Sequence, residues 1–508
     1  MSLSSWRGLA LLVTSAAVLV PAHAYTSTTP LAVPRARILL RRAAPMLKAT
    51  ESPALSSQLP ESLRPASTSV AGATALVAGT TIGAGILALP AKTLEAGFGP
   101  SAVLLTAAWA YMAASALLIA EVNVNTVCAL ERDAVSINTM AKDTIGDVGA
   151  TASSLAYAFI HYALLVAYMI QGGTLLAELV PALNGASSIG FSSTALFAAV
   201  GGGSLLLGTV SQVGKANSAL FAGVVGSFLA LVAVGATQIS PAYLAHTAPA
   251  AALPALPVMV LSFTFHNVVP TITYQLGCDM EKIRVAILGG SLIPLLMFLL
   301  WNGVVLGSVP FDAAASASLD GSIFDPLEAL RAGGDLFGEV VRVFSLLAII
   351  TSFIGFCYGL VDFYADLLNL NNDMPASTLA SDSAGATTLE AALGDDDGDP
   401  YDEPALERPL PIKAGLLSLT LLPPLAIATI DPSLFFSALD NAGTFGILTL
   451  FGIIPCLMAW TQRYGPGADP VVPDALPGGK LTLSAMIGLA CVFVGIEGAE
   501  RLATIGGI

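Results

Sequence analysis

The residues Ala78-Gly79-Thr80-Thr81-Ile82-Gly83-Ala84-Gly85-Ile86-Leu87-Ala88-Leu89-Pro90 lie inside the first long apolar segment of the chain. This stretch is too apolar for a loop and contains too many glycines for a stable helix. An unpaired backbone amide or carbonyl costs several kcal/mol in lipid, so a helix breaks at membrane depth only where protein, water or a ligand satisfies the freed groups. The stretch therefore predicts a broken membrane helix beside a binding site.

A second interrupted segment lies between Leu253 and Tyr274, where Ser262-Phe263-Thr264-Phe265-His266-Asn267 leads into Pro270. Two such breaks at corresponding places of two halves are typical of the substrate site of a secondary transporter. The amino end of a half-helix suits a carboxylate, and free carbonyls suit an ammonium group or a cation. The two charged ends of an amino acid match this arrangement.

The composition is that of a membrane protein with many spans. Apolar residues make up 55% of the 508 residues and charged residues only 11%, whereas about a quarter of the residues of a soluble protein are charged. Much of the net charge of −15 comes from one acidic stretch, so it says little about function. The five cysteines show no clustering with each other or with histidine, and no nucleotide-binding or zinc-protease motif occurs. We expect no enzyme, metal site, cofactor or nucleic-acid partner.

The first 64 residues have the composition of a targeting sequence. Arg7, the apolar run Leu9 to Val20 and the small residues of Ala22-His23-Ala24 predict a cleavable signal peptide over residues 1–24. Residues 25–64 are basic and rich in Ser, Thr, Pro and Ala, which is typical of a transit peptide. This two-part address predicts a plastid reached through the secretory pathway. A plain signal peptide followed by a disordered tail is the alternative.

About eleven membrane spans are expected, since about 20 apolar residues cross the hydrocarbon core. They are predicted at residues 70–90, 99–127, 151–181, 191–210, 217–237, 254–274, 285–307, 338–368, 412–430, 434–461 and 481–501. Lys and Arg gather in the N-terminal tail and in the loops after even-numbered spans, which predicts an N-terminus on the cytosolic-equivalent side, the stroma of a plastid. The acidic stretch 371–409 has no periodicity and is expected to be a disordered loop.

The transporter domain is expected over residues 65–508, as two repeats and one extra helix. The repeats are residues 70–237 and 254–461, and the extra helix is 481–501. Because each repeat crosses the membrane an odd number of times, the second is inverted relative to the first. The broken spans 1 and 6 then occupy equivalent positions around a pseudo-two-fold axis.

Candidates for the substrate site come from spans 1, 3 and 6. Free backbone groups of the first break suit the charged ends of an amino acid, and the mixture of polar groups and rings in the second break suits an aromatic side chain. Polar residues of span 3 fall on one helix face and are expected to face a cavity. The candidates are Thr80, Thr81, Gly83, Ala84, Gly85, Tyr157, His161, Tyr168, Ser262, Phe263, Thr264, Phe265 and His266.

Each candidate has a structural alternative. The glycines of the first break could serve close helix packing, and His266 could bond only to backbone carbonyls. The tyrosines of span 3 could be interfacial anchors, Tyr157 above all.

Four residues are candidates for coupling to a proton or another cation. Glu121 is an intramembrane carboxylate, which is paired, protonated or close to the interface. His266 has an ordinary pKa near neutrality and could carry a proton. Thr351 and Ser352 offer hydroxyl oxygens that suit a hard cation, or that bond their own helix instead. A proton is the expected coupling ion, with sodium as the alternative.

Several spaced stretches resemble the bacterial tyrosine and tryptophan permeases, the hydroxy and aromatic amino acid permease family. They are Ala78 to Pro90, Ser262 to Pro270, Glu281-Lys282-Ile283-Arg284, Ile293-Pro294 to Trp301, Thr351-Ser352-Phe353, Asp362-Phe363, Leu422-Pro423-Pro424, and Ala438-Leu439 to Gly443. The resemblance implies the leucine-transporter-like fold of the amino acid, polyamine and organocation superfamily, with eleven spans. It also implies proton-coupled uptake and a site between spans 1, 3, 6 and 8.

These observations predict a multi-pass carrier of the plastid envelope that moves tyrosine or tryptophan by alternating access, with a proton. Its partners are the amino acid substrate and the lipid bilayer. A serine, threonine or broader neutral amino acid permease is the alternative within the same fold. A non-transporting amino acid sensor is the alternative from another class.

Overall fold

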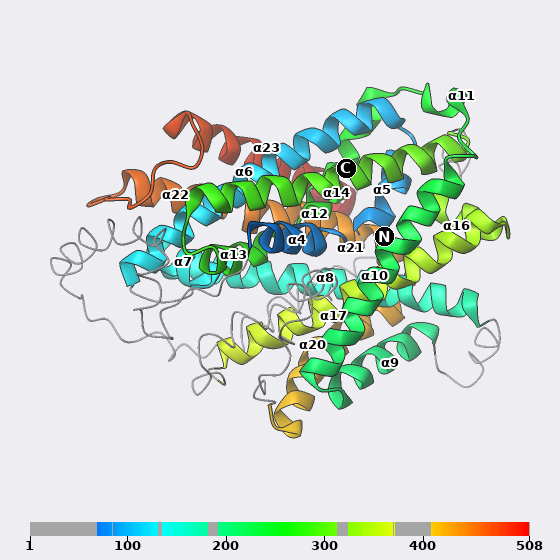
Figure 1. The fold of residues 1–508 in the computed structure, drawn as a ribbon, viewed down its shortest axis with the longest axis horizontal. Coiled ribbons are helices and arrows are strands. Elements are labelled where there is room, and N and C mark those ends of the chain that lie inside the picture. The colour runs from blue at the N-terminus through cyan, green and yellow to red at the C-terminus, as the bar shows by residue number, and fades with distance from the viewer. Residues whose placement is uncertain are drawn as a thin grey trace.

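The computed structural model describes residues 69–83, 85–130, 135–180, 192–311, 324–368, 370 and 408–506. Every regular element within these ranges is a helix, and the long helices run side by side as a bundle (Figure 1). The predicted all-helical class is therefore confirmed for the described part of the chain. The predicted targeting sequence at 1–64, nearly all of the acidic stretch 371–409 and the site candidate Ala84 lie outside it.

The described residues of the first half of the bundle form seven helices. They are α4 (Val70–Thr81), α5 (Gly85–Thr93), α6 (Phe98–Leu130), α7 (Ile137–Ile145), α8 (Asp147–Leu179), α9 (Ser193–Leu207) and α10 (Val210–Gly235).

The second half begins with the interrupted segment predicted around Ser262. Its elements are α11 (Pro241–Leu244), η3 (Pro249–Ala255), α12 (Leu256–Ser262), η4 (His266–Val268), α13 (Val269–Gln275), α14 (Met280–Ser308), α16 (Pro326–Ala332), α17 (Leu336–Leu367), α20 (Leu410–Ile430), η5 (Pro432–Leu434), α21 (Phe435–Asn441), the π-helix η6 (Ala442–Ile453), α22 (Ile454–Tyr464) and α23 (Gly479–Gly506).

The count of membrane spans is lower than predicted. Nine helical segments of the described residues are long and apolar enough to cross a membrane, and the bent pair α4 and α5 gives a tenth. The predicted span at 191–210 corresponds to α9, which has only 15 residues. At 1.5 Å per residue such a helix is shorter than the roughly 30 Å of hydrocarbon. The prediction of eleven full spans thus becomes ten, with α9 as a shorter apolar helix.

The broken helices lie at the centre of the bundle. In Figure 1, α4 and α12 occupy the middle of the view, between α6 and α14 above and α8 and α17 below. In the most apolar part of each helix, 78% of α8 is buried inside the bundle but only 17% of α23. A helix that is apolar on all sides and buried is a core helix, whereas α23 presents most of its surface to lipid.

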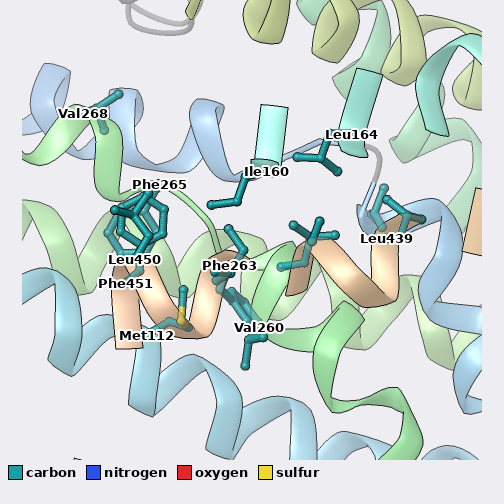
Figure 2. Close-up of a cluster of buried hydrophobic side chains, with 14 of the residues drawn as sticks. Met112, Ile160, Leu164, Val260, Phe263, Phe265, Val268, Leu439, Leu450 and Phe451 are labelled. Carbon is teal, nitrogen blue, oxygen red and sulfur yellow. The ribbon is translucent and has the colours of Figure 1, made fainter. Parts of the chain in front are cut away.

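A cluster of aromatic and aliphatic side chains fills the space around α12. Phe263 and Phe265 are 0% and 1% exposed, and Figure 2 shows Phe265 beside Leu450 and Phe451 of η6. Residue Gly446 lets η6 approach α8, because a methyl group there would lie 2.3 Å from Cγ1 of Ile160. The break in span 6 is therefore surrounded by tightly packed side chains.

Ion pairs connect the helices at both faces of the bundle. We call the face where α4 begins the inner face, and the face where α5 ends the outer face. At the outer face Arg331 of α16 donates from Nε to Glu178 at the end of α8, at 3.1 Å. At the inner face Arg408 pairs with Asp362 of α17 at 2.8 Å.

Candidate functional site

The first break separates α4 from α5, whose axes differ by 55°. Ile82 leaves the helical conformation with φ −79° and ψ 94°. The hydroxyl groups of Thr80 and Thr81 donate to carbonyls of their own helix, Leu76 at 2.9 Å and Val77 at 2.6 Å. The predicted role of these threonines depends on their backbone groups and not on the hydroxyl groups, so it stays a prediction.

The second break lies between α12 and η4. Phe263 ends α12 with φ −98° and ψ 31°, and Phe265 precedes η4 with φ −129° and ψ 7°. The hydroxyl groups of Ser262 and Thr264 again donate to their own segment, to Val258 and Leu261, both at 2.7 Å. The hydroxyl oxygens of Ser262 and Thr264 can still accept a hydrogen bond, for example from an ammonium group.

The two breaks meet each other and a third helix. A methyl group on Gly85 would lie 2.6 Å from Oγ and 3.0 Å from Cα of Ser262, and one on Gly83 would lie 3.4 Å from Oγ of Ser352 in α17. Glycine allows this approach at position 85, because a Cβ atom does not fit 2.6 Å from Oγ of Ser262 and the Ser262 backbone leaves little room to move away. Spans 1, 6 and 8 of the predicted site thus converge at one place.

Span 3 joins this place through an aromatic face shared by α8 and α17. The side-chain hydroxyl groups of Tyr168 and Ser352 lie close enough to interact. The ring of Phe356, one turn after Ser352, lies 5.5 Å from Tyr168 and 4.9 Å from His161, centroid to centroid. We call the residues His161, Tyr168, Ser352 and Phe356 the α8–α17 face. Two of them were predicted from the stripe on span 3.

Tyr157 lies next to this face on its inner side. Its ring stacks on His161 at 4.0 Å, and its hydroxyl donates to the Gly359 carbonyl at 3.3 Å. The ring of Phe363 lies 5.0 Å away. Tyr157 therefore packs between α8 and α17 one turn before His161 and supports its ring.

The three ring residues predicted from the second break contact other helices. Phe263 packs on Phe298 of α14, with centroids 5.3 Å apart. His266 is 0% exposed, its Nε2 lies 3.1 Å from the Met112 carbonyl oxygen of α6, and its ring stacks on Phe451 at 4.5 Å. Phe265 lies beside the same Phe451 (Figure 2). These contacts match the structural alternative for His266, since they fill the core with rings instead of turning them toward α8 and α17.

Glu121 is fully paired in the structure. Its two oxygens accept from Nε and Nη2 of Arg463, both at 2.6 Å, and Oε2 also accepts from the Ala475 amide at 2.6 Å. The carboxylate is 0% exposed. A bidentate pair with a further backbone donor satisfies a buried charge. Glu121 therefore fastens α6 to α22 and to the loop after it at the inner face.

The two hydroxyl residues predicted in span 8, Thr351 and Ser352, make different contacts. Thr351 donates to Leu347 and Ala348 of its own helix, at 3.0 and 3.1 Å. Ser352 instead faces Gly83 and Tyr168. Of the coupling candidates, only Ser352 lies at the meeting point of the breaks.

Three features of the structure were not predicted from the sequence, namely Phe356, Arg463 and an outer ion pair between Lys92 and Asp440. Phe356 has no signal of its own, since phenylalanine is ordinary in a membrane span. Asp440 did have a signal in the sequence, because it is a charged residue inside a predicted span.

Comparison with known proteins decides the family. Residues 66–387 and 405–497 match the tryptophan/tyrosine permease family. The chain belongs to this family. It is therefore a multi-pass membrane transporter of the aromatic amino acid permeases, and not an enzyme.

Individual relatives in this permease family agree with the match. The chain is 30% identical over 438 residues to the tyrosine-specific transport system 1 of Haemophilus influenzae, covering 85% of this chain and 96% of that protein. It is 27% identical over 412 residues to a tryptophan-specific transport protein of the same organism, covering 78% and 88%. It is 30% identical over 316 residues to a low affinity tryptophan permease of Escherichia coli, covering 58% and 73%. Both breaks and the α8–α17 face lie inside the region that matches the family.

Proposed function

We propose that this permease carries tyrosine or tryptophan across its membrane by alternating access, coupled to protons. The observation that carries the proposal is the meeting of the two breaks at Gly85 and Ser262 beside Ser352. The relatives named for tyrosine and tryptophan support the choice of substrate.

The charged ends of the substrate are assigned to the backbone of the breaks. The amino end of α5 begins at Gly85, and the carboxyl ends of α4 and α12 lie at Thr81 and Ser262. A helix amino end carries about half a positive charge and a carboxyl end about half a negative charge. The first suits the carboxylate of an amino acid, and the second suits its ammonium group.

The ring of the substrate is assigned to the α8–α17 face. Tyr168 meets Phe356 edge to face, with 71° between the ring planes, and Phe356 is only partly buried. Aromatic rings favour offset or edge contacts over face-to-face stacking, and such contacts add to the burial of apolar area. This assignment replaces Phe263, Phe265 and His266 by His161, Tyr168 and Phe356 as the side-chain subsite.

Phe356→Ala is expected to raise the apparent KM for tyrosine by about tenfold, since an aromatic contact and its buried area are lost together. Uptake of labelled tyrosine into proteoliposomes measures this. Phe363→Ala is the matched control, because Phe363 lies on the same helix but contacts Tyr157. An equal rise in both variants would contradict the assignment of the ring to Phe356.

Alternating access is assigned to two inverted repeats, residues 70–237 and 254–461. Under this proposal the broken spans 1 and 6 move together against the other helices. In the structure Thr80, Gly83, Thr264 and Ser352 are partly exposed, and charged pairs connect the helices at both faces.

Proteoliposome transport tests the function as a whole. Labelled tyrosine is expected to accumulate when the outside is more acidic than the inside, and unlabelled tryptophan is expected to compete far better than serine. Equal competition by serine would favour the serine or threonine alternative. Saturable tyrosine binding without accumulation or exchange would favour the sensor and overturn the proposal.

The plastid envelope is proposed as the location, on the composition of the N-terminal residues. The match to the family begins at residue 66, so the basic segment at 25–64 lies outside the transporter domain. Residues 1–64 fused to a fluorescent protein are expected to direct it to plastids, and residues 1–24 alone only to the secretory pathway. Secretion of both fusions would contradict the location without touching the transport function.

A further inference from the structure

A buried ion pair connects the outer half of span 1 to the start of span 10. Lys92 lies in the last turn of α5, and its Nζ is 2.6 Å from Oδ2 of Asp440 in α21. The two side chains are only 14% and 15% exposed. The Lys92 ammonium also lies 5.7 Å from the ring centre of Phe436. A charged residue inside a membrane span is expensive and is commonly retained for function.

Only one oxygen of Asp440 is paired. Oδ1 is buried and has no hydrogen-bond partner among the described residues. Buried polar atoms are nearly always satisfied, and an exception needs an explanation. Glu121 shows the contrast, since both of its oxygens are held by Arg463. Oδ1 of Asp440 is thus a buried acceptor at which an added proton could bind.

Two further residues of span 10 have a buried side-chain oxygen like Oδ1 of Asp440. Oδ1 of Asn441 and Oγ1 of Thr444 are also buried without a partner in the described part of the chain. Asn441 and Thr444 are 3% and 0% exposed. Since span 10 runs from the outer face at Pro432 to the inner face at Tyr464, these atoms lie on the inner side of Asp440.

Charged residues of α23 lie near the pair of Lys92 and Asp440. Arg501 of α23 and Lys92 both attract the Asp440 carboxylate. Glu497 of α23 interacts with Arg501, Glu500, Asp440 and Lys92, and its carboxylate lies 3.7 Å from Arg501. The negative charge of Glu497 thus opposes ionisation of Asp440, whereas the two cations favour it.

We propose that Asp440 is the proton-coupling carboxylate of this transporter and that Oδ1 is the atom that takes the proton. The inference rests on the proton coupling of the proposed function. Lys92 belongs to the broken span 1, which moves in alternating access, so the pair lies where α5 and α21 separate when the outer side opens.

The proposed cycle uses the charge of this pair. A proton from the outer solution forms an O–H bond at Oδ1, and the neutral side chain no longer attracts Lys92. The end of α5 then parts from α21 and the outer side opens. When the outer side closes, the ammonium of Lys92 returns to Oδ2 and favours the ionised carboxylate. The O–H bond breaks, and the proton leaves past Asn441 and Thr444 to the inner solution.

Two assays on the full-length protein in proteoliposomes test this. The first measures tyrosine uptake while the outside pH is lowered from about 7.5 to about 5.5. The second measures exchange of labelled for unlabelled tyrosine at equal pH on both sides. In Asp440→Asn, acid stimulation of uptake is expected to vanish, whereas exchange stays within about threefold of the natural protein. Asp440→Glu is expected to keep the stimulation.

The matched control is Asp474→Asn. Like Asp440, Asp474 is an aspartate that pairs with a cation. Its partner is Arg463 of span 10, at 3.0 Å, and this pair lies at the inner face. It is expected to keep acid stimulation. Acid stimulation of Asp440→Asn equal to that of the natural protein would overturn the inference.

If Asp440→Asn does not fold or does not exchange tyrosine, a second variant, Lys92→Gln, tests the inference. In Lys92→Gln the carboxylate remains and its cation is gone, so half-maximal uptake is expected at a higher outside pH. An unchanged pH profile would overturn the inference in that case. If the natural protein exchanges tyrosine without any acid stimulation, the proton coupling of the proposed function fails as well.

Discussion

Gly85→Ala is expected to reduce tyrosine uptake to less than about a tenth of the natural rate. The new methyl group would lie 2.6 Å from Oγ and 3.0 Å from Cα of Ser262. The second atom belongs to the backbone, so the clash cannot be relieved by rotating a side chain. Either α5 or α12 must shift, and both breaks then lose the geometry of the proposed substrate site. Uptake per inserted molecule in proteoliposomes measures the effect.

The matched control is Gly226→Ala in α10. A methyl group there meets no heavy atom of the described residues within 4 Å, so uptake is expected to stay near that of the natural protein. Combining Gly85→Ala with Ser262→Gly removes Oγ and Cβ of Ser262 and is expected to restore part of the activity. If Gly85→Ala transports normally, the contact between the breaks does not define the site.

Glu121→Gln is expected to lower the free energy of unfolding by about 3–5 kcal/mol, because it leaves the buried guanidinium of Arg463 without its buried counter-charge and with only the half-exposed carboxylate of Asp474. Glu121 is 0% exposed and holds Arg463 through two bonds of 2.6 Å. Thermal unfolding of the purified protein in detergent would show a clear decrease in Tm. Removal of both charges, in Glu121→Met with Arg463→Met, is expected to recover much of the loss, since an apolar replacement of a buried pair is often close to neutral.

Asp474→Asn serves as the comparison for this pair. Its carboxylate binds the same Arg463 but is 45% exposed, and an exposed ion pair contributes at most about 1 kcal/mol. Glu121 was also predicted as a candidate proton carrier. If it carries the proton, Glu121→Gln is expected to keep the Tm of the natural protein and to lose only the response of uptake to pH.

Much of the candidate site could be predicted because it depends on the backbone. Glycine near a break and proline after it disturb a helix in any context, so Gly83, Gly85 and Ser262 could be named as candidates from the sequence. The stripe on span 3 was found because residues three or four apart share a helix face. Tyr168 and His161 do lie together against α17.

Side-chain direction could not be predicted at the second break. Outside a regular helix, neighbouring residues have no fixed spacing around an axis. Phe263, Phe265 and His266 therefore looked equally suited to a pocket, whereas their rings pack on α14 and η6. The partner of a buried charge could not be predicted either, because Glu121 and Arg463 are 342 positions apart in the chain.

The amino-acid sequence alone determined that this protein is a helical membrane protein with two broken spans, since hydropathy and helix-breaking residues act locally and need no tertiary contact. Only the tertiary structure decided which atoms meet at those breaks, which rings face α8 and α17, and which buried carboxylate keeps an unpaired oxygen. Such contacts join residues that are distant in the chain, and they depend on how whole helices pack.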